Sequence, residues 1–287
     1  MLRIAYVNGR YVEHADAQVH IEDRGYQFAD GVYEVCEIVR GNIMDMRRHL
    51  DRLDRSLREL QIVWPKHRSA IEVILAEVVR RNRVRNGMVY LQVTRGVAPR
   101  DHVFPGADVP SSMVVTAKRI DRDAATARAE KGVSVITVPE NRWERVDIKT
   151  VGLLPNVLAR QKAKLAGAYE AWFIDPDGTV KEGGATNVWI VNQQGVLITR
   201  PAETGILRGV TRTTLFDVAK KHGLKIEERG FTVEEAQSAR EVFITAATSV
   251  VMPVTSIDGV TVANGHPGSI ALSLRSGLFD VAEKTPA

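Results

Sequence analysis

Turn-forming residue pairs separate many of the apolar segments of this sequence. Asn8-Gly9 lies between the alternating segments IAYV and RYV, and Gly41-Asn42 follows VYEVCEIVR in a similar way. A glycine beside an asparagine readily adopts the left-handed backbone of a two-residue hairpin turn. The first 50 residues are therefore expected to form strands joined by tight turns. Later turns are predicted at Asp177-Gly178, Gln194-Gly195 and Asp258-Gly259.

Two helices are expected to follow the first strands. Leucines recur at helical spacing from Leu50 to Leu60, and isoleucine, leucine and valine do the same from Ile71 to Val79. Strands return in MVYLQVTRG and SMVVTAKRI, which completes an α+β unit near residue 120. The polar, alanine-rich segment IDRDAATARAEKG is interpreted as the link to a second domain.

The rest of the chain also alternates strands and helices. Strands are predicted in VSVITVPE, YEAWFID, VWIVN and EVFITAATS. One helix is expected over about 156–166, and another from Gly209-Val210-Thr211 to about His222, with Gly223 as its stop signal. Since 287 residues exceed what one average core organises, we predict an α+β protein with two domains, 1–120 and 121–287.

Composition and charge exclude several classes of protein. The net charge is only +4 and the basic residues are scattered, so nucleic-acid binding is not expected. No run approaches the roughly 18 apolar residues of a membrane span, and no signal peptide is apparent. The histidines lack zinc-binding spacing, so no metal is predicted. Cys36 is the only cysteine, which excludes an internal disulfide and favours a reducing, cytoplasmic location.

Lys149, in DIKTVGLLPNV, and Glu182, in VKEGGATNVW, are candidates for cofactor chemistry. Apolar neighbours and two upstream arginines, Arg142 and Arg145, suit a lysine amine of lowered pKa, which must be neutral to act as a nucleophile. A carboxylate can hold a pyridine nitrogen protonated, and glycines beside it allow a flat ligand to approach. If both side chains face one pocket, the chain can hold an aldehyde cofactor. The alternatives are a surface lysine paired with Asp147 and an exposed glutamate in a turn.

Two segments can supply donors for a phosphate. The segment GILRGVTR, residues 205–212, precedes a helix whose first N–H groups and dipole attract anions. The small-residue turn Ala246-Ala247-Thr248 can add further N–H groups. Each signal is weak by itself, because every capped helix offers such donors.

Six motifs in family order resemble the fold-type IV pyridoxal-phosphate enzymes, which include D-amino-acid transaminases, branched-chain aminotransferases and aminodeoxychorismate lyases. The resemblance runs from about Val7 to Gly259. It implies a small N-terminal α/β sandwich-like domain, a larger C-terminal pseudo-barrel domain and pyridoxal 5′-phosphate as cofactor. The motifs are FADGVYEV (28–35), HLDRL (49–53), DIKTVGLLPNVLA (147–159), EGGATNVW (182–189), GILRGVTR (205–212) and FITAATS (243–249).

The resemblance also implies roles for single residues. Lys149 would hold the cofactor as an internal aldimine and move the proton between Cα and C4′, and Glu182 would pair with the pyridine nitrogen. Arg52 would bind the phosphate, although its place off the leucine stripe fits a solvated arginine equally well. Leu207 would pack against the ring. Further cofactor contacts would come from Gly209, Val210, Thr211, Ala246 and Ala247, the two alanines through their backbone alone.

The stretch QVTRGVAPRDHVFP, residues 92–105, resembles D-amino-acid transaminases in particular. There an arginine and a histidine two residues apart bind the substrate carboxylate of the neighbouring subunit, which implies this role for Arg100 and His102, with Tyr33 joining them. The expected reaction transfers the amino group of a D-amino acid such as D-alanine to a 2-oxo acid such as 2-oxoglutarate or pyruvate. A homodimer is implied. The simpler interpretation of Arg100 and His102 is a proline-flanked polar loop.

Other activities on the same scaffold remain open at this point. They are a branched-chain L-amino-acid transaminase, an (R)-amine transaminase and an aminodeoxychorismate lyase. A non-catalytic metabolite- or cofactor-binding protein that kept the fold is the alternative from a different class.

Overall fold

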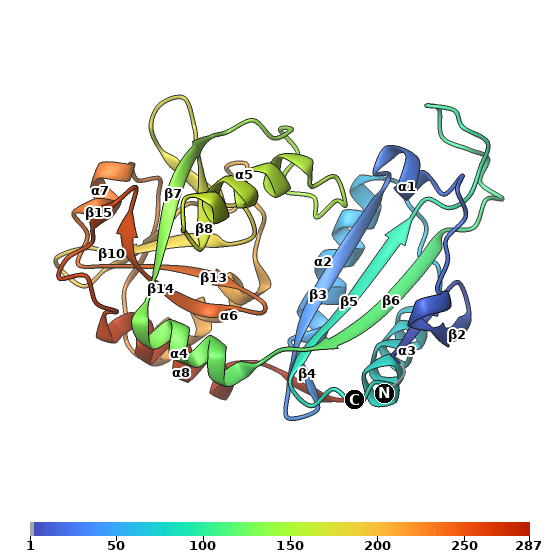
Figure 1. The fold of residues 1–287 in the computed structure, drawn as a ribbon, viewed down its shortest axis with the longest axis horizontal. Coiled ribbons are helices and arrows are strands. Elements are labelled where there is room, and N and C mark those ends of the chain that lie inside the picture. The colour runs from blue at the N-terminus through green and yellow to red at the C-terminus, as the bar shows by residue number, and fades with distance from the viewer. Residues whose placement is uncertain (1–2) are drawn as a thin grey trace. The chain divides into compact units, whose positions relative to one another are not determined.

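A computed structural model describes residues 3–287 of the chain, which divides into two compact units (Figure 1). Unit 1 comprises the residues up to Arg122 together with Ile148–Gly152 and Glu283–Ala287, and unit 2 comprises Asp123–Asp147 and Leu153–Ala282. Each unit contains a sheet and helices, so the predicted α+β class is confirmed. Whether 1–120 and 121–287 fold as separate domains stays a prediction.

The sheet of unit 1 has seven strands, all paired antiparallel, in the order β16-β4-β3-β5-β6-β1-β2. Asn8 and Gly9 have φ of 44° and 98° and form the predicted hairpin turn. The second hairpin turns one residue earlier than predicted, at Arg40-Gly41, because Asn42 already pairs with Val39 in the ladder. The strands are β1 (Ile4–Val7), β2 (Arg10–Glu13), β3 (Gly31–Val39), β4 (Asn42–Met44), β5 (Gly87–Thr94), β6 (Ser112–Arg119) and β16 (Lys284–Pro286).

Two long helices, α2 (Met46–Glu59) and α3 (Arg68–Arg81), contribute their apolar stripes to the core of unit 1. Both were expected from the spacing of their apolar residues. Those that are buried are Leu50, Leu53 and Leu57 on α2 and Ile71, Ile74, Leu75, Val78 and Val79 on α3. A short 3-10 helix, η1 (His14–Asp16), and the single-turn helix α1 (Arg24–Phe28) complete this unit.

The sheet of unit 2 has nine strands in the order β12-β11-β10-β13-β14-β7-β8-β9, with β15 beside β14. Three of its pairings, β11 with β12, β14 with β7 and β7 with β8, are parallel. Its core contains the fully buried rings of Trp172, Trp189 and Phe243. The strands are β7 (Val133–Pro139), β8 (Glu170–Ile174), β9 (Val180–Gly183), β10 (Asn187–Val191), β11 (Leu197–Thr199), β12 (Ile226–Glu228), β13 (Glu241–Ala246), β14 (Val250–Ile257) and β15 (Val260–Thr261).

The helices of unit 2 include both predicted ones, α5 (Leu154–Leu165) and α6 (Val210–Lys221), the latter followed by Gly223 at φ 68°. The segment interpreted as a link forms the helix α4 (Arg122–Lys131), because its alanines favour helix and Ala129 is buried. The sequence analysis did not predict α8 (Ser269–Val281). The short helix α7 (Val233–Gln237) begins after Thr232, whose side chain accepts from the N–H of Glu235.

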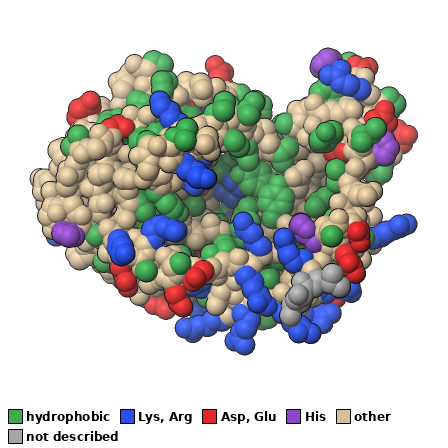
Figure 2. All heavy atoms as spheres, in the orientation of Figure 1, with side chains coloured by type: hydrophobic (Ala, Val, Ile, Leu, Met, Phe, Trp, Pro, Cys, Tyr) green, Lys and Arg blue, Asp and Glu red, His purple; other side chains and the backbone are tan. Residues whose placement is uncertain are grey.

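The exposed charged side chains are of both signs (Figure 2). On the face shown in Figure 2, acidic side chains lie among the basic ones, as expected for a small net charge. Across residues 3–287, no helix combines the length and the apolarity that a membrane crossing requires.

The core of unit 1 makes a direct stability prediction. Leu53, on α2, is completely buried, so Leu53→Ala should lower the free energy of unfolding by about 2–5 kcal/mol, through lost burial and a residual cavity. Urea denaturation of the cofactor-free protein measures this. Val73→Ala, on the exposed side of α3, is the control and should change stability by less than about 0.5 kcal/mol. Equal effects of the two changes would contradict the described core.

Candidate active site

The segment Ile148–Gly152 is held against the first residues of β3. The N–H of Tyr33 donates to the carbonyl of Lys149 at 3.0 Å, and the N–H of Val151 donates to the carbonyl of Gly31 at 3.0 Å. An isolated antiparallel bridge joins Val32 to Thr150 between these bonds. The backbone from Lys149 to Val151 is therefore fixed by the sheet of unit 1.

The Lys149 amine lies beside Tyr33. Its Nζ is 3.2 Å from the Tyr33 hydroxyl oxygen and 4.3 Å from the centre of the ring, and both side chains are half-buried. The alternative of a surface lysine paired with Asp147 is wrong, because Asp147 accepts two bonds from Arg145, at 3.0 and 3.1 Å. The Tyr33 ring stacks on Tyr90, whose pKa burial raises to about 12. Tyr90 therefore stays neutral across the physiological range.

Arg52 is part of a buried ion pair. Its Nε and Nη2 donate to the two carboxylate oxygens of Glu34, each at 2.8 Å, and Nδ1 of His49 lies 2.7 Å from the same carboxylate. Burial raises the pKa of Glu34, but Arg52 and His49 outweigh it and lower the pKa from 4.5 to about 2. A solvated Arg52 is thus wrong. A guanidinium has five N–H donors, so the pair with Glu34 is compatible with a further bond to an anion.

Arg100 and His102 lie in the loop between β5 and β6, and both are exposed. The structure brings them together around one aromatic ring. The Arg100 guanidinium carbon lies 5.1 Å from the centre of the Phe28 ring, and the His102 ring centre lies 5.4 Å from it. Figure 1 shows this loop projecting beyond the ends of its two strands.

Glu182, in β9 of unit 2, is buried rather than exposed in a turn. One of its carboxylate oxygens accepts from Arg142 Nη1 at 2.7 Å. The other accepts from Asn187 Nδ2 at 3.3 Å and from the N–H of Leu207 at 3.2 Å. Arg142 also binds Glu140, and these two carboxylates outweigh burial and raise the pKa of the guanidinium. The network holds the Glu182 carboxylate in one orientation.

The start of α6 provides donors for an anion. Gly209 is its N-cap and no side chain caps the helix, so the first-turn N–H groups, including those of Val210 and Thr211, have no intrahelical partner. A Cβ at position 209 would lie 2.1 Å from Asn187 Oδ1, so only glycine fits there. These N–H groups, with the positive end of the helix dipole, fit a phosphate.

The turn between β13 and β14 contains Ala246 and Ala247, which offer backbone donors only. Two features of this turn are unusual. Val250 has φ of 60°, a strained value for a β-branched residue, and the buried Ser249 hydroxyl has no hydrogen-bond partner within residues 3–287. Strain of this kind concentrates at functional sites, which agrees with the expected place of the turn in a phosphate site.

The predicted site residues are distributed over both units. The pairing of Lys149 and Glu182 in one pocket stays a prediction, because Lys149 belongs to unit 1 and Glu182 to unit 2. No group of metal-ligating side chains occurs within residues 3–287. Unit 1 holds Tyr33, Arg52, Arg100, His102 and Lys149, and unit 2 holds Glu182, Leu207, Gly209, Val210, Thr211, Ala246 and Ala247.

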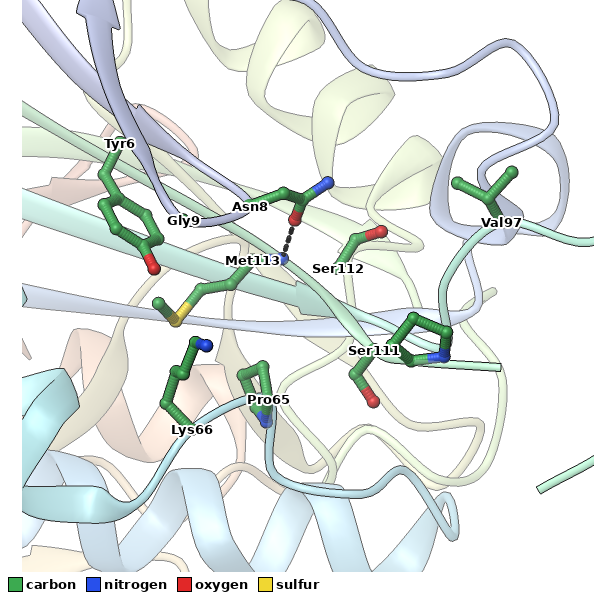
Figure 3. A pocket seen from close by; sticks show the side chains of 10 residues that line it. Tyr6, Asn8, Gly9, Pro65, Lys66, Val97, Ser111, Ser112 and Met113 are labelled. Carbon is green, nitrogen blue, oxygen red and sulfur yellow. Dashed lines mark hydrogen bonds between the residues drawn. The ribbon is translucent and has the colours of Figure 1, made fainter. Parts of the chain in front are cut away.

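A separate hollow of unit 1, with a volume of about 290 Å³, contains none of these residues. Figure 3 shows it beneath the turn at Asn8-Gly9, with Lys66 on one side and Ser111 on another. Asn8 Oδ1 accepts from the N–H of Met113, and Ser111 Oγ donates to the carbonyl of Val63. These bonds join the hairpin turn to the sheet, so the polar groups here have a structural role.

Sequence reasoning missed Glu34, His49 and Asn187. Glu34 interrupts the apolar strand GVYEVCEIV, and His49 lies three residues before Arg52 on the same helix face. A charge inside an apolar strand indicates a buried partner, and this signal could have singled out Glu34 without identifying the residue it meets. Nothing in the sequence marks Asn187 as a neighbour of Glu182.

Comparisons with known proteins identify the family of the chain. The family model described as amino-transferase class IV matches residues 31–257. The chain is 42% identical over 271 residues to a D-alanine aminotransferase of Bacillus licheniformis, covering 94% of each chain. Its fold matches the branched-chain amino acid aminotransferase of Escherichia coli with a TM-score of 0.90 at 22% identity, covering 98% and 95% of the two chains. A T.th. branched-chain amino acid aminotransferase with pyridoxamine 5′-phosphate gives a TM-score of 0.89 at 26% identity, covering 98% and 94%.

The Glu34–Arg52 pair makes stability depend on pH. Glu34→Gln should lower the free energy of unfolding at pH 7 by about 3 kcal/mol, because it leaves a buried arginine without its carboxylate. The pKa of Glu34 is lower in the folded protein, so the wild-type advantage exists above pH 4.5 and shrinks as pH falls towards 2. Urea midpoints between pH 3 and 7 test this. Glu13→Gln, at an exposed glutamate of β2, is the control, and a wild-type advantage independent of pH would refute the pairing.

Proposed function

Because the chain belongs to the class IV aminotransferases, we propose that it transfers the amino group of a D-amino acid such as D-alanine to 2-oxoglutarate or pyruvate, using pyridoxal 5′-phosphate. The observation that carries the proposal is the half-buried Lys149 amine 3.2 Å from the Tyr33 hydroxyl, in a chain 42% identical to a D-alanine aminotransferase. The branched-chain aminotransferases share the fold at lower identity. A cytoplasmic location stays a prediction based on the single, buried cysteine.

Lys149 is the group that would bind the cofactor covalently and carry the proton. When bound, the cofactor supplies an electron sink that stabilises negative charge on the substrate Cα. The lysine amine, once released and neutral, accepts the Cα proton as a general base. The Tyr33 hydroxyl, at hydrogen-bond distance from Nζ, holds that amine in place. Backbone bonds at Lys149 and Val151 fix the origin of the side chain, which favours repeated transfer along one path.

The residues of unit 2 fit the other parts of the cofactor. Glu182, held by Arg142, Asn187 and the N–H of Leu207, would accept a hydrogen bond from a protonated ring nitrogen. The uncapped start of α6, with Val210 and Thr211, would bind the phosphate. Arg52 of unit 1, whose Nε and Nη2 bind Glu34, would add a further charged donor to the phosphate. Leu207 would pack against the ring, and Ala246 and Ala247 would donate through their backbone.

Arg100 and His102 would bind the substrate carboxylate. A guanidinium grips a carboxylate through two parallel bonds, and an imidazole adds a third donor. With the carboxylate held, the face of Cα that meets the lysine amine is fixed, which selects one enantiomer. Exposed apolar side chains on α1 and in the loop itself support a homodimer. In it, Arg100 and His102 of one copy would bind the substrate carboxylate of the other.

The support for a homodimer is physical. An ion pair fully exposed to water contributes little to binding, so Arg100 needs a surface that excludes water around the carboxylate. Tyr26 on α1 and Val103 and Phe104 in the loop are apolar, yet each is more than half exposed. Apolar side chains gathered beside functional charges are typical of an interface. A second copy of the chain that covers this region would exclude water from the carboxylate site.

Lys149→Ala should abolish turnover of D-alanine, because no other amine takes the place of Nζ beside Tyr33. Borohydride reduction followed by mass spectrometry should find the cofactor covalently attached in the wild type and absent from the variant. Lys118→Ala, at an exposed lysine of β6, is the control and should keep both the attachment and the activity. Attachment retained in Lys149→Ala would end the lysine assignment.

Arg100→Ala should raise KM for D-alanine by about 100-fold, the effect expected when a bidentate charged contact is lost. Turnover of a carboxylate-free amine such as (R)-1-phenylethylamine should be unchanged. Arg119→Ala, an exposed arginine on β6, is the matched control. Equal losses on both substrates would count against a carboxylate site. L-leucine turned over in preference to D-alanine by the wild type would instead favour the branched-chain alternative.

A further inference from the structure

We infer that Arg24, held by Asp30, is the positioning residue that orders the loop carrying Arg100 and His102. The inference rests on the proposed function, because it assumes that these two side chains bind the substrate carboxylate. It adds residues of α1 and of the segment before β3 to the determinants of substrate affinity.

The Arg24 side chain lies beneath the loop and is 3% exposed. Its Nη1 donates to the carbonyl of Asp101 at 2.6 Å and to that of Val103 at 3.3 Å, and its Nη2 donates to the carbonyl of His102 at 3.5 Å. One guanidinium thus binds three consecutive carbonyls of a loop whose side chains face solvent. Residues 101–103 belong to no strand or helix, so the Arg24 guanidinium provides the hydrogen bonds to their carbonyls that strand pairing would otherwise provide.

Asp30 fixes the guanidinium from the other side. Arg24 Nε donates to Asp30 Oδ2 at 2.8 Å, and Arg95 donates to both oxygens of the same carboxylate, at 2.7 and 2.9 Å. Burial raises the pKa of Asp30, but the two arginines outweigh it and lower the pKa, so the carboxylate stays charged at neutral pH. Asp30 therefore joins two buried arginines into one rigid group.

Both arginines of this group also contact aromatic rings at the loop. The Arg95 guanidinium carbon lies 3.5 Å from the centre of the Phe104 ring, at the far end of the loop. The Arg24 guanidinium carbon lies 4.9 Å from the Phe28 ring, the ring that stands between Arg100 and His102. The loop backbone and the ring that Arg100 and His102 contact are thus held by the same buried group of Arg24, Asp30 and Arg95.

Only arginine can fill this role at position 24. Its planar group presents donors in two directions at once, towards a carboxylate and towards several carbonyls. A lysine keeps the charge, but its single ammonium cannot reach Asp30 and three carbonyls in this arrangement. Arg24→Lys therefore removes loop order while it preserves the charge and the hydrophobic stem.

The holoenzyme of Arg24→Lys tests the inference. KM for D-alanine should rise by about 10-fold while kcat changes by less than about 3-fold, since displacement of a positioning loop weakens binding of the carboxylate. Backbone hydrogen exchange over residues 99–105 should become faster by about 10-fold or more, while exchange in β3 and β5 and the cofactor absorbance stay unchanged. Arg81→Lys, which removes an arginine stacked on Tyr11 of unit 1, is the control and should leave all four measurements unchanged.

A second variant covers the case in which Arg24→Lys fails to fold. Phe104→Ala removes a ring that is 52% exposed, so the fold tolerates its loss, and it should change KM and exchange in the same direction by about 3-fold. Wild-type KM and wild-type exchange in both folded variants would overturn the inference, as would a loss confined to kcat. If Arg100→Ala leaves KM for D-alanine unaltered, the carboxylate site of the proposed function fails. Faster exchange over 99–105 in Arg24→Lys would then still support the ordering of the loop.

Discussion

Pairing of Ile148–Gly152 with the start of β3 is the constraint on which the chemistry of this chain depends. Two backbone bonds and a bridge fix the chain from Lys149 to Val151, so the position of Nζ depends mainly on the side-chain torsions of the lysine. Tyr33 belongs to the same short ladder, and its hydroxyl meets the amine at 3.2 Å. Groups placed by a sheet are held more accurately than groups on free loops, which suits a lysine that must return to one position.

Buried carboxylates of the candidate site are each joined to an arginine. Glu34 binds Arg52, Glu182 binds Arg142, and Asp30 binds both Arg24 and Arg95. A buried charge without a partner would cost several kcal/mol, so these pairs allow the core to contain the ionised groups that cofactor chemistry needs. Each pair also fixes an orientation, because a guanidinium and a carboxylate meet in a forked geometry. Stability and positioning are thus produced by the same contacts.

Much of the architecture could be predicted, and the limits have physical causes. Asn8-Gly9 and the stripe from Ile71 to Val79 determine local structure, so their hairpin and helix were predictable. The helix around Ala129 was not predicted, because polar, alanine-rich sequence fits a link and a helix alike, and the boundary between the two units lies at its start. Partners distant in sequence were not predictable: Arg52 and Glu34, 18 residues apart, meet only through the packing of α2 on β3. The family motifs identified candidate residues, and the structure adds what holds them.

The exposed loop shows why a binding site on the surface needs its own internal order. A side chain such as Arg100 gains little from a carboxylate in water, and much of that gain is lost again if binding must first order the loop. An ordered loop removes this cost before the substrate arrives. In this chain the loop is ordered by the buried Arg24, which binds three loop carbonyls and is itself held by Asp30. The outer face of the loop can then remain exposed for contact with a partner. Its backbone is fixed from the inner side by Arg24 and its partner Asp30.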